Sequence, residues 1–207
     1  MSLALLISGC ALFPTAKPVQ PQTSPSPEQS LQAFNQHAKR LAQFDAWALS
    51  ARVGVKSPQG AYSGNLEWIQ NQDNFSITVS GPLGQGTSII EGTAEEVTLT
   101  NGKTGEITRG EPTALMNQAL GWSLPMDYLK LWIKGHPGTA KLNHNPTSDI
   151  TLNNENTLAL LNHANWHLEY SRYQTGTYNI PLPHKVVASN PALKLTFIIK
   201  NWSELQP

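Results

Sequence analysis

Residues 47–80 read WALSARVGVKSPQGAYSGNLEWIQNQDNFSITVS, and this stretch decides the fold class. Apolar and polar side chains alternate along it, as Phe75, Ile77 and Val79 do with the polar residues between them. A period of two is typical of strands that bury one face. Turn residues at 57–60 and 71–74 separate three such runs. The stretch therefore predicts antiparallel strands joined by short turns, with one apolar face.

Further strands and a few helices are expected outside this stretch. A helix is predicted to start at Pro27, because Ser26 provides an N-cap, Pro27 an N1 proline and Gln29 an N3 amide. Prolines and glycines bound two short helical segments at 113–120 and 126–134. We therefore predict an α+β fold in which helices lie on the apolar face of a sheet that could curl toward a barrel. The remaining strands are expected at 87–92, 97–100, 105–109, 157–161, 166–170, 185–188 and 193–202.

The N-terminus resembles the processing site of a bacterial lipoprotein. The run MSLALLISGC places small residues directly before Cys10, the single cysteine. In such sites the thiol takes a diacylglycerol, and the new N-terminus takes an acyl chain after cleavage. A complete signal has a basic segment and a longer apolar core, so we expect a translation start upstream of Met1. The alternative is an ordinary apolar N-terminus with an incidental cysteine.

The residues after Cys10 predict a tether between the lipid and a folded domain. Prolines at 14, 18, 21, 25 and 27 alternate with polar residues, which favours extended polyproline II with a reach of roughly 50 Å. We therefore divide the chain into a partial signal peptide at 1–9, a lipidated tether at 10–27 and a domain at 28–207. Ala11, which stands where an aspartate would retain a lipoprotein at the inner membrane, fits the outer membrane.

Composition and motifs exclude several functional classes. Fourteen basic residues balance fourteen acidic ones, and no basic stripe is visible in the sequence, which argues against nucleic-acid binding. Neither a nucleophile elbow nor a phosphate loop is present. His163 and His167 would lie about 13 Å apart on a strand, too far for one metal ion. We therefore expect no catalytic residues, no metal and no cofactor beyond the lipid on Cys10.

Several motifs, taken in order, resemble the LolB family of lipoprotein receptors. They extend over about residues 30–203 and include ARVGV at 51–55, GNLEWIQ at 64–70, GPLG at 81–84, GWSLP at 121–125, LWI at 131–133, Pro183 and the run from Leu193 to Trp202. The resemblance implies an incomplete, half-open and curved antiparallel barrel. It also implies helices over the concave face and an apolar cavity beneath them.

The resemblance implies a function as well. A monomer held at the periplasmic face of the outer membrane of a Gram-negative bacterium would accept lipoproteins from the periplasmic carrier LolA through their acyl chains. It would then release them into the membrane, which buries the chains more completely. Two alternatives stay open: a structural or assembly lipoprotein without a lipid cavity, and a hydrolase whose site the sequence does not show.

The candidate site residues follow from strand parity and from the resemblance. Leu83 lies at the tip of the GPLG loop, and in the family the leucine of this loop protrudes and helps to place cargo in the membrane; the alternative is a leucine folded back onto the sheet. Arg52 and Arg109 could meet acidic groups on the carrier or lipid headgroups, or simply be solvated. The candidates for lining the acyl cavity are Val53, Trp68, Ile77, Val79, Leu115, Leu129, Trp132 and Trp166. Each of them could instead belong to the ordinary hydrophobic core.

Overall fold

The structure is a computed structural model that describes residues 26–81, 86–115, 125–138, 149–176 and 178–205. Helix α1 (Pro27–Gln43) begins with the predicted cap. Ser26 Oγ accepts a hydrogen bond from the backbone N–H of Gln29, and the Gln29 side chain accepts one from the backbone N–H of Ser26. This reciprocal arrangement satisfies two amide groups that a helix start otherwise leaves without partners.

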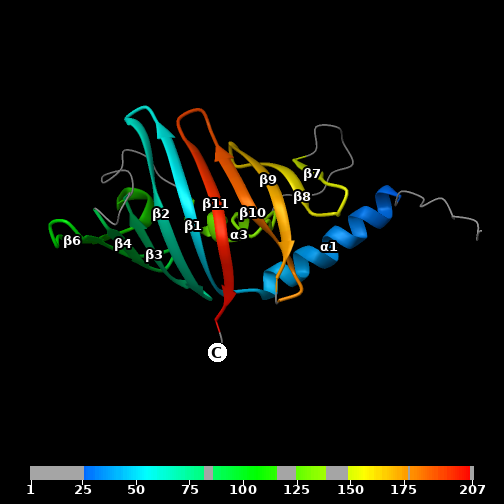
Figure 1. The fold of residues 1–207 in the computed structure, drawn as a ribbon, viewed down its shortest axis with the longest axis horizontal. Coiled ribbons are helices and arrows are strands. Elements are labelled where there is room, and N and C mark those ends of the chain that lie inside the picture. Colours follow the sequence, from blue (N-terminus) through cyan, green and yellow to red (C-terminus); the bar gives the residue numbers. More distant parts are fainter. Residues whose placement is uncertain (1–25, 82–85, 116–124, 139–148, 177, 206–207) are drawn as a thin grey trace, which may run out of the picture.

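In the described residues, eleven strands form one antiparallel sheet (Figure 1). The strands are β1 (Ala46–Ser57), β2 (Gly60–Asn71), β3 (Asn74–Ser80), β4 (Ser88–Gly92), β5 (Val97–Asn101), β6 (Ile107–Gly110), β7 (Ile150–Leu152), β8 (Leu158–His163), β9 (Trp166–Thr175), β10 (Pro181–Ser189) and β11 (Lys194–Glu204). Their order is β6-β5-β4-β3-β2-β1-β11-β10-β9-β8-β7, so β1 pairs with β11. Strands β6 and β7 remain at the two edges, which confirms a barrel that is not closed.

One face of the sheet carries the core. Trp47 and Leu49 of β1 and Trp68 of β2 are buried on this face. Described parts of the chain between β6 and β7 lie against this face: a helical turn at 112–115 and helix α3 (Met126–Trp132), which lies behind β10 and β11 in Figure 1. Leu115 and Leu129 of these helical pieces are buried against the sheet. The expected helical cover of the apolar face is therefore confirmed.

A β-bulge in β11 changes which of its side chains face the core. The register between β1 and β11 shifts at Lys200, which has no partner in β1. Ile199 before the bulge and Trp202 after it are both buried, although they are three positions apart in the sequence. A single extra residue shifts the alternation of side chains by one position, so that the residues after the bulge change faces. It brings Trp202 against Trp47, which also contacts Trp68, with ring centroids 5.3 and 5.1 Å apart.

Most of the predicted segments differ from the observed elements by one or more residues at an end, and strand β7 was not predicted. The strand expected at 105–109 begins only at Ile107, because Gly105 adopts a φ of +72° in the preceding turn. The helix expected at 126–134 ends at Trp132, and Gly135 with a φ of +80° follows it. Cys10, Leu83 and most of the tether lie outside the described residues. None of the helices in the described ranges is long and apolar enough to cross a bilayer.

Gly64 in β2 lies too close to β3 for a side chain. A Cβ at this position would be 2.4 Å from the carbonyl oxygen of Ser80, whereas one at Gly54 would meet only Thr196 Cβ at 4.0 Å. We expect Gly64→Ala to lower the free energy of unfolding by about 1–3 kcal/mol, because the backbone must shift. Gly54→Ala should be neutral or raise it by about 0.5 kcal/mol. Urea denaturation of both variants measures the difference, and equal stabilities would contradict the close approach.

Candidate binding cavity

An apolar cavity of about 490 Å³ lies between the core face of β1–β5 and β11 and the helical pieces that cover it. Its size falls within the range of roughly 300–1,000 Å³ that is typical of small-molecule sites. The described residues that line it are Val53, Val55, Gln59, Tyr62, Leu66, Trp68, Phe75, Ile77, Val79, Gly86, Ser88, Ile90, Val97, Leu99, Asn101, Pro112, Leu115, Met126, Leu129, Leu195 and Phe197.

The polar lining residues gather at one end of the cavity. Gln59, Tyr62 and Asn101 are exposed and lie at or near the strand ends next to the β1–β2 turn. Gly86, which follows the GPLG loop, is exposed at this end as well. We call this end the mouth. Because Trp68 at the other end is 1% exposed, the cavity leads from a polar mouth to an apolar interior.

The interior presents no unsatisfied polar group at Trp68. Its indole N–H donates to Oε1 of Gln70 at 3.1 Å. The Gln70 side chain, 2% exposed, in turn donates to the carbonyl oxygens of Gln72 and Asn74 at 2.7 and 3.3 Å. A ligand therefore meets only the apolar face of the tryptophan. Since the described lining residues also include no charged side chain, the cavity suits a hydrocarbon.

Two of the predicted cavity residues lie elsewhere. Trp132 is 1% exposed and stacks on Tyr128 with ring centroids 5.3 Å apart. Trp166 lies 6.2 Å from Trp132, and both belong to an aromatic cluster beside β8 and β9. They face the half of the sheet that is away from the cavity. The predicted residues that do line the cavity are Val53, Trp68, Ile77, Val79, Leu115 and Leu129.

Several lining residues were not predicted, although the alternation of the strands contains them. Phe75 shares the parity of Ile77 and Val79 in β3, and Val97 and Leu99 alternate in the same way in β5. The period of two was therefore a sufficient signal for strand residues. Strand alternation could not identify Met126, because this residue belongs to helix α3 and its position depends on how that helix packs on the sheet.

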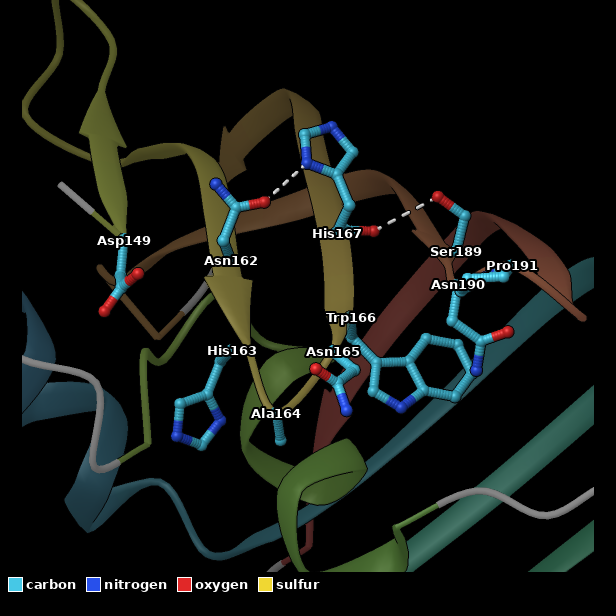
Figure 2. Close-up of a pocket in the computed structure, with 10 residues that line it drawn as sticks. All are labelled: Asp149, Asn162, His163, Ala164, Asn165, Trp166, His167, Ser189, Asn190 and Pro191. Carbon is cyan, nitrogen blue, oxygen red and sulfur yellow. Dashed lines mark hydrogen bonds between the residues drawn. The ribbon is translucent and has the colours of Figure 1, made fainter. Parts of the chain in front are cut away.

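Figure 2 shows a second hollow, of about 560 Å³, beside the β8–β9 turn. Its lining is mostly polar, and two of its side chains pair with each other, because Nδ1 of His167 lies 2.7 Å from Oδ1 of Asn162. Nε2 of His167 lies 3.5 Å from Glu169, which is outside the lining. His163, by contrast, packs edge-on against Tyr128 at 4.7 Å. The two histidines therefore have separate partners. This hollow offers little apolar surface and is the weaker candidate site.

Buried basic groups connect the end of α3 to the end of α1. Lys134 is 3% exposed and donates to the carbonyl oxygen of Phe44 at 2.6 Å. Burial lowers the pKa of Lys134 to about 8, against the opposing effect of the Asp45 carboxylate. Burial also lowers the pKa values of His37 and His136 to about 4, with nearby cations contributing. Both histidines are therefore neutral at pH 7, and the Lys134–Phe44 hydrogen bond joins the chain after α3 to the end of α1.

Comparisons with known proteins agree with this geometry. The family model described as outer membrane lipoprotein LolB matches residues 45–202. The chain is 32% identical to the outer-membrane lipoprotein LolB of Stutzerimonas stutzeri, over 99% of this chain and 93% of that protein. It is also 32% identical to the LolB of Pseudomonas paraeruginosa, over 99% and 94%.

Solved structures show the same fold at low sequence identity. A LolA superfamily protein from Nitrosomonas europaea matches with a TM-score of 0.56 and 7% identity, over 86% of this chain and 94% of that one. A DUF1329 family protein from Desulfovibrio piger matches with a TM-score of 0.52 and 8% identity, over 84% and 93%. These likenesses support the open, curved barrel.

Proposed function

Because the chain belongs to the LolB family of outer-membrane lipoproteins, we propose that its cavity receives the acyl chains of lipoproteins delivered by the periplasmic carrier LolA. The domain acts as a monomer at the periplasmic face of the outer membrane. Lipid on Cys10 and the tether at 10–27 hold it there. After loading, it releases the lipoprotein into the membrane.

The observation that carries this proposal is the uncharged cavity with its internally satisfied Trp68 and Gln70. Each methylene group of an acyl chain gains about 0.8 kcal/mol when it leaves water. Hydrophobic attraction has no preferred direction, so chains that differ in length and unsaturation can bind the same walls. A cavity of this kind recognises the lipid and leaves the protein part of the cargo free to vary.

The open mouth accounts for the direction of transfer. Tyr62 at the mouth is 62% exposed, so water reaches part of a bound chain. A bilayer buries the whole chain, and the hydrophobic free energy therefore favours release into the membrane. In this proposal transfer needs neither nucleotide nor metal.

The cavity also bears on the competing functions. A structural or assembly lipoprotein would be expected to fill this volume with side chains, because protein interiors are close-packed. A hydrolase would place a nucleophile and a base together. The described lining contains no histidine, cysteine or carboxylate. Lipid handling without catalysis is therefore the function that the site supports best.

The full chain carrying Cys10→Ala tests this separation of anchor from receptor. We expect it to accept a labelled lipoprotein from LolA as well as the lipidated protein does, because the cavity is intact. It should not deliver the cargo specifically to outer-membrane vesicles, because the anchor is missing. Acceptance is measured by the shift of label from LolA to the variant on a sizing column. Loss of acceptance would show that the anchor itself is part of the receptor.

A further inference from the structure

Sheet pairing gathers basic residues that are far apart in the sequence. β1, β11 and β10 are neighbours in the sheet. Arg52 on β1 and Lys185 on β10 both pair with Ile198 on β11, and Lys56 on β1 pairs with Lys194 on β11. We call Arg52, Lys56, Lys185 and Lys194 the basic stripe. Because Lys56 lies four residues beyond Arg52, the stripe extends about 13 Å along the strands.

The basic stripe lies on the face of the sheet opposite the cavity. Successive residues of a strand point to opposite faces. Val53, Val55 and Leu195 alternate with stripe residues and line the cavity. The side chains of the stripe therefore point outward, and those of Arg52, Lys56 and Lys194 are exposed.

Few acidic groups oppose the stripe. Within β1, β10 and β11 the acidic residue is Glu204, at the far end of β11. On the flanking strands Glu67 pairs with Ser50, and Glu169 is already close to His167. Among the described residues, neither of the ion pairs found involves the stripe. A chain with no net charge thus has one face with a local excess of positive charge.

Two lysines of the stripe face each other directly at the mouth end. Lys56 and Lys194 are Cα partners across β1 and β11, and like charges in such a position destabilise a sheet. Their other strand partners are Ala61 and Ser189, so no carboxylate in the paired strands relieves the repulsion. Gln59 at the mouth is only three residues from Lys56. An external anion bound between the two ammonium groups would remove the repulsion.

We infer that the mouth end of the basic stripe docks on the phosphate groups of anionic lipid headgroups, so that the cavity mouth is held beside the bilayer. This inference rests on the membrane anchoring in the proposed function. The tether expected at 10–27, with a reach of roughly 50 Å, would keep the stripe within reach of the surface. Because the domain is already attached, even weak contacts suffice to orient it.

Vesicle binding by the full chain carrying Cys10→Ala tests this orientation. The chain is cosedimented with phosphatidylethanolamine vesicles that contain phosphatidylglycerol, and separately with phosphatidylcholine vesicles. We expect binding to the acidic vesicles alone, weakening as salt is added. Lys56→Gln with Lys194→Gln should weaken binding roughly 30-fold, which corresponds to about 1 kcal/mol for each lysine. The matched control is Lys39→Gln with Lys200→Gln, which removes the same charge elsewhere and should leave binding unchanged.

Three results would overturn the inference. One is equal binding to acidic vesicles by the wild type and the Lys56 and Lys194 double variant. Another is complete displacement by inorganic phosphate at matched ionic strength, which would assign the site to free phosphate. The third is unchanged vesicle binding by the double variant with loss of acceptance from LolA, which would assign the stripe to an acidic protein surface.

Fatty-acid binding separates this inference from the proposed function. A wild-type chain that binds a fluorescent fatty acid but no acidic vesicles would contradict the docking inference alone. A chain that binds acidic vesicles through Lys56 and Lys194 but no fatty acid would contradict the cavity function and support the docking surface.

Discussion

A Leu83→Glu variant should accept lipoprotein from LolA at the wild-type level and deliver almost none of it to outer-membrane vesicles. Leu83 is three residues before Gly86 in the sequence, and Gly86 lines the mouth of the cavity. An apolar side chain so close in sequence to the mouth is expected to enter the bilayer when the cargo leaves. A carboxylate there opposes entry by on the order of 2.5–3.5 kcal/mol, so delivery should fall about 100-fold.

Acceptance and delivery must be measured separately to interpret this variant. Acceptance is the transfer of labelled cargo from LolA, and delivery is its later recovery in sedimented vesicles. Leu83→Met provides the control, because it keeps an apolar side chain and should deliver normally. If Leu83→Glu delivers cargo as the wild type does, the loop leucine has no part in membrane insertion.

The local pattern of the sequence was enough to predict most of the strands and much of the cavity, although it did not reveal β7. Alternation places Val53, Ile77 and Val79 on one face of their strands, and the structure puts all three in the cavity lining. The cap at Ser26 could also be predicted, because a capping box involves residues that are only three positions apart in the sequence. Features that depend on short sequence separations are therefore accessible from the residues alone.

Features that depend on distant pairing were not accessible. Trp132 and Trp166 were expected to line the cavity, yet only the tertiary fold decides that they pack together away from it. The basic stripe was invisible for the same reason, since Lys56 and Lys194 become neighbours through the pairing of β1 with β11. Trp202 is a further case, because the bulge at Lys200 changes its parity.

A carboxylate in the cavity should strongly weaken acyl binding, whereas the same group on the other face of the strand should not. Val79 in β3 lines the cavity, and its neighbour Thr78 points to the opposite face. Burying a polar group without a partner costs about 1–3 kcal/mol, and a charge costs more. We therefore expect Val79→Asp to weaken fatty-acid binding by about tenfold or more. Thr78→Asp, opposite Glu67, should affect stability slightly and binding not at all.

Titration of these two variants with a fluorescent fatty acid, in the full chain carrying Cys10→Ala, tests the central claim most directly. Both variants should first show the near-UV circular dichroism of the parent chain, so that a change in affinity reflects the cavity. The account predicts weak binding by Val79→Asp and parental binding by Thr78→Asp. Parental binding by Val79→Asp, or an equal loss in both variants, would contradict the claim that acyl chains bind between the sheet and its helices.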